Sequence, residues 1–116
     1  MNMTFAKQDD VGVIHVGETR IDAGMAIAFK DRFRALVDGA QGDIVLDLST
    51  VEFLDSSGLG AVVAARKLLG SGRTLALAGL TPAVNKVMTL TRMNMVFPIY
   101  DDCGAAVAGQ STAVAK

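Results

Sequence analysis

The spacing of apolar and polar side chains predicts that strands and helices alternate along most of the chain. Residues 3–7 and 11–16 are rich in apolar and β-branched side chains and are separated by a polar turn, which predicts a β-hairpin. From Asp22 onward the apolar positions recur every three or four residues. This period predicts an amphipathic helix of about 17 residues, with the short Asp22 side chain as its N-cap.

The second half of the chain continues this alternation. Residues 43–48 are apolar with little alternation, which predicts a central strand covered on both faces. We expect a second helix from the DSSGLG sequence to Gly70, a strand over residues 74–78, a third helix from Pro82, a strand over residues 96–100 and an Ala-rich helix over residues 102–116. The order predicts one α/β domain over residues 1–116, with a mixed central sheet, an N-terminal hairpin and about four helices.

Charge and hydropathy exclude several classes of partner. The chain has 11 basic and 12 acidic side chains, so it offers no basic surface for nucleic acid. Its apolar runs fall far short of the roughly 20 residues that span a bilayer, and its first residues do not resemble a signal peptide. We therefore expect a cytoplasmic protein with no nucleic-acid and no membrane partner.

The chain is poor in catalytic side chains. It has one Cys, Cys103, and one His, His15, so a Cys–His metal cluster or an intrachain disulfide is excluded. His15 lies within a predicted strand, where a half-buried sheet residue is expected, and nothing near Cys103 would activate its thiol. We expect no metal, no cofactor and no enzymatic activity.

Residues 47–60, with the sequence DLSTVEFLDSSGLG, carry the candidate chemistry. They place an Asp, two hydroxyls and two glycines on a loop that follows a buried strand and leads into a helix, a position where ligands and modifications are common. Ser56 or Ser57 is suited to cap this helix, and a capping serine keeps its oxygen at the positive end of the helix dipole.

The sequence VEFLDSSGLGAVVAARKLL resembles the signature of the STAS family, the domain of bacterial anti-sigma factor antagonists. Asp47 in its strand and the passages over residues 77–82 and 88–99 follow the order of that family. The resemblance implies that a partner, which is both an anti-sigma factor and a serine/threonine kinase, phosphorylates the serine directly after the Asp. That serine is Ser56, with Ser57 as the fallback, and a PP2C-type phosphatase would be a second partner.

The same resemblance implies a partner-binding surface around Ser56. In the family the Asp before the first helix faces the partner, and Asp22 occupies that position, although the segment GETRID is two residues longer than the usual motif. We expect the following residues to contribute: Asp22, Asp55, Ser57, Gly58, Leu59 and Gly60. Leu59 is expected to be an exposed contact, whereas the two glycines either admit a partner or let the helix pack close to the sheet.

Other interpretations of the sequence remain open. A STAS domain also serves as a module of other regulatory or lipid-transport assemblies. A phosphoacceptor receiver domain would use Asp47 together with Asp9 and Asp10 for Mg²⁺. A hydrolase would need His15 as the base for Ser56, or Asp47 and Asp55 as paired carboxylates. Partner switching by phosphorylation of Ser56 is the interpretation that the DSSGLG sequence favours.

Overall fold

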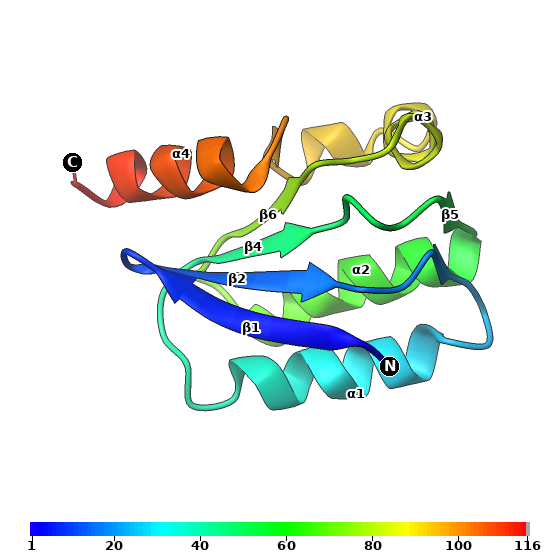
Figure 1. Ribbon diagram of the computed structural model, residues 1–116, viewed down its shortest axis with the longest axis horizontal. Helices are drawn as coiled ribbons and strands as arrows, with labels where there is room; N and C mark the ends of the chain where they lie inside the picture. Colours follow the sequence, from blue (N-terminus) through cyan, green and yellow to red (C-terminus); the bar gives the residue numbers. More distant parts are fainter. Residues whose placement is uncertain (116) are drawn as a thin grey trace.

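A mixed β-sheet organises the protein, shown as a computed structural model in Figure 1. The structure describes the backbone of residues 1–115 and the side chains of residues 1–110. Within these residues the sheet has five strands, in the order β1 (Met3–Gln8), β2 (Val11–Val16), β4 (Ile44–Asp47), β6 (Leu75–Ala78) and β7 (Ile99–Tyr100). β1 is antiparallel to β2 and the other pairs are parallel. The predicted hairpin, the mixed sheet and the central place of β4 are confirmed.

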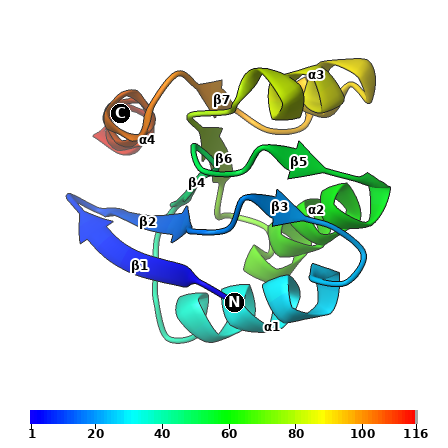
Figure 2. The ribbon, with the colours of Figure 1, turned by 45° about the vertical axis from the view of Figure 1, so that its right-hand side comes forward.

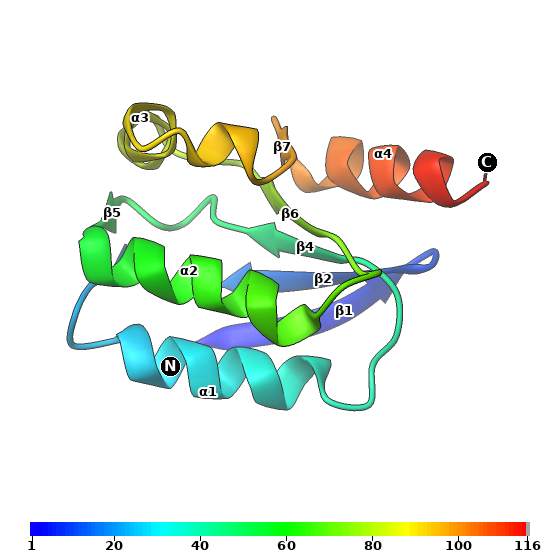
Figure 3. The same cartoon turned by 180° about the vertical axis from the view of Figure 1, so that it is seen from behind.

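Four α-helices form within the described residues, as predicted. α1 (Ala26–Val37) and α2 (Ser56–Leu69) lie on one face of the sheet, and α4 (Cys103–Ala115) lies on the other (Figures 1 and 3). α3 (Pro82–Leu90) begins at its proline, as expected, and leads into a short 3₁₀ helix, η1 (Met93–Met95). The prediction for Lys116 lies outside the described residues.

Two apolar clusters fill the space above and below the sheet. Alternate side chains of β4 divide between them, because Ile44 and Leu46 belong to the larger cluster beside α1 and α2 whereas Val45 belongs to the smaller one beside α4. The smaller cluster is built from buried valines and alanines, among them Ala76 and Ala106. These small side chains let α4 lie close to the sheet, so the prediction that β4 is covered on both faces is confirmed.

A second, very short sheet positions the candidate site. β3 (Arg20–Ile21) and β5 (Phe53–Leu54) pair in parallel, with Arg20 opposite Phe53. Figure 2 shows these two strands side by side near the beginning of α2. The sequence analysis did not predict this pair, because two residues are too few to show a period.

Two elements, α1 and β7 (Ile99–Tyr100), differ from the prediction by more than one residue at an end. α1 has 12 residues and begins at Ala26 rather than after an Asp22 cap. The Asp22 side chain instead accepts a hydrogen bond from the Gly24 N–H, and its carbonyl accepts one from the Met25 N–H, so residues 23–25 form turns. The strand predicted over residues 96–100 is limited to Ile99–Tyr100, because Pro98 has no N–H with which to extend the pairing.

Candidate functional site

Asp55 is the N-cap of α2, in place of the predicted Ser56 or Ser57. Its backbone is extended, with φ −92° and ψ −176°, and its Oδ1 accepts a hydrogen bond of 2.8 Å from the Gly58 N–H. The two serines are therefore the first two residues of the helix. This correction leaves both hydroxyls free of the capping role that the sequence analysis gave them.

Ser56 and Ser57 are both exposed at this helix end. The first N–H groups of a helix have no partner within the helix, and together with the helix dipole they favour negative charge. Ser56 lies directly beside the Asp55 carboxylate, so its hydroxyl combines an accessible position with a backbone that a cap holds in place.

The two glycines of the DSSGLG sequence have different roles. A Cβ atom at Gly58 would overlap the carbonyl oxygen of Ile21, so the absent side chain is what lets α2 pack against β3. A Cβ atom at Gly60 would have no heavy atom within 4 Å, and this residue is exposed. Close packing therefore explains Gly58, whereas Gly60 leaves an open surface on α2.

Leu59 is not the exposed contact that the sequence analysis expected. Its side chain is half-buried and packs against the larger apolar cluster. The close approach of α2 to β3 at Gly58 draws this first turn onto the core, so Leu59 offers a partner only part of its side chain.

The loop that carries Asp22 lies against the start of α2. The Ala23 N–H donates a hydrogen bond of 3.2 Å to Asp55 Oδ2. Asp22 uses one oxygen for its own turn and the other for an ion pair of 3.0 Å with Arg20 Nε. The structure thus brings the Asp22 loop and Asp55 to the same end of the molecule.

Two residues of this surface were missed by the sequence analysis. Phe53 keeps 44% of its area exposed, and the Arg20 guanidinium lies 4.7 Å from the centre of its ring. The signal in the sequence was the neighbouring Leu54, because adjacent strand residues point to opposite faces and a buried Leu54 turns Phe53 outward.

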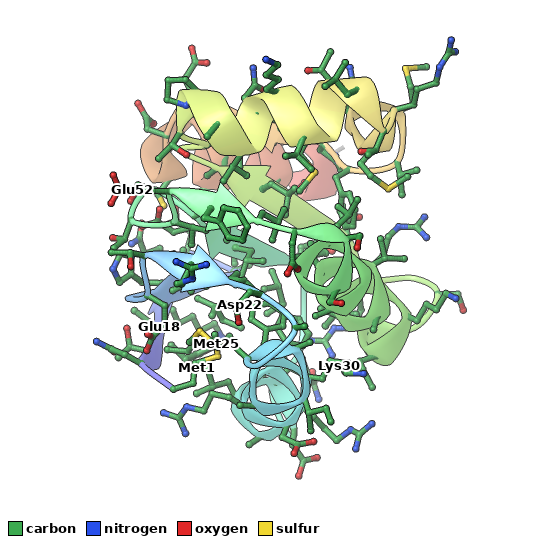
Figure 4. All side chains as sticks on the ribbon, turned by 90° about the vertical axis from the view of Figure 1, so that its right-hand side faces the viewer. Met1, Glu18, Asp22, Met25, Lys30 and Glu52 are labelled. Carbon is green, nitrogen blue, oxygen red and sulfur yellow. The ribbon has the colours of Figure 1, made fainter. Side chains whose placement is uncertain are left out.

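These residues form one surface at the beginning of α2. We call it the α2 N-terminal surface and define it as Arg20, Asp22, Phe53, Asp55, Ser56, Ser57 and Gly60. Figure 4 views the molecule from this end and labels Asp22 together with the acidic residues Glu18 and Glu52. An aromatic ring with a cation over it, bordered by carboxylates, is suited to binding another protein.

The alternative sites do not assemble. Asp47 Oδ2 lies 2.9 Å from His15 Nδ1 and Asp47 Oδ1 accepts the Ser49 N–H, whereas the Asp55 carboxylate binds the Gly58 and Ala23 N–H groups. These hydrogen bonds are made to different groups, so the two carboxylates do not form a catalytic pair. His15 is the half-buried sheet residue that was expected and pairs with Asp47 rather than with Ser56.

Burial, hydrogen bonds and charge shift the pKa of Asp47 and that of the neighbouring Cys103. Partial burial alone would raise the pKa of Asp47, but hydrogen bonds from the Ser49 backbone and the His15 side chain outweigh it and hold the pKa below its ordinary value. Burial, followed by the charge of Asp47, raises the pKa of the Cys103 thiol to about 11. The expected low reactivity of Cys103 is thereby explained.

The receiver-domain site is also incomplete. Asp9 and Asp10 form the turn that opens β2, whereas Asp47 lies opposite His15 near its other end. The three residue steps from Gly12 to His15 alone span about 10 Å along the strand, which is too far for one Mg²⁺ to bridge the carboxylates at its two ends. Within the described residues no group of three or more His, Cys, Asp or Glu side chains is arranged to hold a metal ion.

No helix in the described part of the chain is long and apolar enough to cross a membrane.

Several known proteins are similar to this chain in sequence and in fold. The chain is 35% identical to the anti-sigma F factor antagonist of Paenibacillus polymyxa over 60 residues, about half the length of each chain. It is 27% identical to BtrV of Bordetella bronchiseptica in an alignment that covers 100% of each chain. The crystal structure of an anti-sigma factor antagonist from Mycobacterium paratuberculosis superposes with a TM-score of 0.85 at 29% identity, covering 95% of this chain and 93% of that one. Because residues 2–106 match the STAS domain, this chain belongs to the STAS family.

Proposed function

We propose that this chain is an anti-sigma factor antagonist that acts by partner switching. In its unphosphorylated form it binds an anti-sigma factor that is also a serine/threonine kinase, and the sigma factor is released. Phosphorylation of Ser56 ends the binding, and a PP2C-type phosphatase restores it. The STAS family and the antagonist names of the Paenibacillus and Mycobacterium relatives support this proposal.

The observation that carries the proposal is the exposure of Ser56 on the first residue of α2, directly after the capping Asp55. A kinase reaches this hydroxyl without unfolding the chain. The added phosphate carries a charge of about −1.5 to −2, which a helix N-terminus favours by about 0.3–1 kcal/mol. The fold is therefore expected to survive the modification.

The same charge is large enough to end the binding. Moving a population from almost fully bound to almost fully free takes about 5.5 kcal/mol of differential free energy. An uncompensated charge buried in an interface costs about 3–5 kcal/mol, and repulsion from partner carboxylates that face this surface adds to it. No large conformational change of this chain is needed.

A protein with this role acts as the substrate of its kinase and needs no catalytic residue of its own. We accordingly infer that the chain is not an enzyme, uses no cofactor and works in the cytoplasm with protein partners. The fold alone does not select among STAS modules, so another regulatory or lipid-transport assembly is the competing function. The exposed Ser56 and the aromatic Phe53 beside it favour the phosphorylation switch.

The test compares charge at two adjacent serines. Ser56→Ala is used as bait in native cytosol, and the recovered proteins are identified by mass spectrometry. We expect an ATP-binding anti-sigma kinase, which binds Ser56→Ala but not Ser56→Glu and phosphorylates the wild type at residue 56. Ser57→Glu is the matched control and should retain more binding, and the melting temperatures of all variants should be similar. Tight kinase binding by Ser56→Glu, or recovery of transport subunits alone, would reject the proposal.

A further inference from the structure

A cavity of about 540 Å³ lies at the end of α2 that is remote from Ser56. α2 has 14 residues, so its two ends are about 20 Å apart. Figure 3 shows α2 beginning beside β5 and leading at its other end into β6, where the cavity is found. Its lining includes the cations Arg66, Lys67 and Arg73 and an apolar wall of Leu75, Val96 and Pro98.

Arg73 has an unmet hydrogen-bonding capacity. Its Nε donates a hydrogen bond of 2.8 Å to the carbonyl of Gly42, which fixes the guanidinium at the cavity. Its Nη2 is buried and has no hydrogen-bond partner among the described residues. Buried polar groups are nearly always paired in proteins, so one donor of this guanidinium is left without an acceptor beside the cavity.

In the part of the chain that the structure describes, the cations of the cavity form no ion pair, although the nearby Asp43 carboxylate accepts a hydrogen bond from the Thr74 N–H. Within the described residues, the ion pairs are His15 with Asp47 and Arg20 with Asp22, and neither pair lines the cavity. Arg66 and Lys67 lie in the last turn of α2, where the helix dipole favours positive charge, and this explains why cations occur there. The dipole does not account for Arg73, which follows the helix on the loop to β6.

We propose that this cavity binds a small phosphorylated molecule. A guanidinium matches the paired oxygens of a phosphate, and Arg66 and Lys67 would add attraction at the rim. The wall of Leu75, Val96 and Pro98 would contact an apolar part of the same ligand. The cavity volume lies in the range of small-molecule sites, about 300–1,000 Å³. A free metabolite and a lipid headgroup share this chemistry, and the free metabolite is the assignment made here.

The probe is inorganic pyrophosphate, added to the full chain at low ionic strength while backbone amide signals are followed by NMR. We expect saturable shifts centred on residues 70–74 and weaker binding as salt is added. Arg73→Gln should weaken the binding by about tenfold or more. The double variant Arg66→Gln/Lys67→Gln, which keeps the Arg73 contact with Gly42, should weaken it as well.

Two controls make the result specific. Lys86→Gln removes an exposed cation from α3 and should leave the pyrophosphate affinity unchanged, and Ser56→Glu should do the same because it lies at the other end of α2. Shifts that do not saturate, or equal affinity for wild type and Arg73→Gln, would overturn the proposal. Vesicles of phosphatidic acid and phosphatidylcholine form a separate arm, and binding to these without binding to pyrophosphate would overturn the assignment to a free metabolite.

Discussion

The Asp55 carboxylate joins Ala23 to the start of α2. Its Oδ2 accepts the Ala23 N–H at 3.2 Å while its Oδ1 accepts the Gly58 N–H at 2.8 Å. One side chain therefore caps a helix and fixes the loop that leads to α1. Any change at this residue affects two segments of the α2 N-terminal surface together.

Asp55→Ala should lower the free energy of unfolding by about 1–2 kcal/mol, because the helix loses its cap and the loop loses its acceptor. Urea unfolding measures the change. Ser57→Ala, at an exposed neighbouring position, should stay within about 0.5 kcal/mol of the wild type. Equal stability of Asp55→Ala and wild type would show that the carboxylate does not hold these segments.

The two glycines of α2 should respond in opposite directions to the same substitution. Gly58→Ala should lower the free energy of unfolding by about 1–3 kcal/mol, because the new methyl group meets the Ile21 carbonyl. Gly60→Ala should raise it by about 0.5–1 kcal/mol, because the position is open and alanine favours the helix. Denaturant unfolding of both variants checks the pair, and similar values for the two would contradict the packing of α2 on β3.

Phe53→Ala should weaken binding to the proposed anti-sigma kinase by roughly tenfold or more, because exposed aromatic residues often carry much of an interface's energy. The matched control is Leu90→Ala on α3, whose side chain is 73% exposed and lies outside the α2 N-terminal surface. Calorimetric titration of the kinase with each variant measures the difference. If both substitutions have the same effect, Phe53 is not part of the interface.

The stability that Asp47 contributes should depend on pH. Because its pKa is lower in the folded chain than in the unfolded chain, the contribution is complete above the unfolded pKa of about 4 and is lost as the pH falls through the folded value. The wild type should therefore exceed Asp47→Asn in stability at pH 7, and the gap should narrow at pH 3. Unfolding curves at both values measure it, and a constant gap would count against the His15 and Ser49 hydrogen bonds as its source.

The elements set by periodicity were predictable from the sequence, and those set by distant contacts were not. The strand that contains Ile44, Val45 and Leu46 was recognised as a continuous apolar run of the right length. β3 and β5 have two residues each and form only because the chain brings Arg20 opposite Phe53. Their contact, which adds both residues to the α2 N-terminal surface, could not be found from local spacing.

The position of the helix cap shows a second limit. Asp and Ser both cap helices, and the sequence analysis named Ser56 or Ser57 as the cap rather than Asp55. The extended backbone of Asp55, which directly follows β5, decides among them. Ser56, the serine named by the family resemblance, is exposed and directly follows that Asp.

The contact between Gly58 and the Ile21 carbonyl limits how far the start of α2 can move when a charge is added at Ser56. With no space left between them, the first turn of α2 cannot move toward β3 to relieve repulsion at Ser56. A phosphate on Ser56 would therefore leave the position of this turn unchanged and would alter the binding of the partner protein. The modification should thus appear in association and dissociation rates, while the backbone of the free chain stays the same.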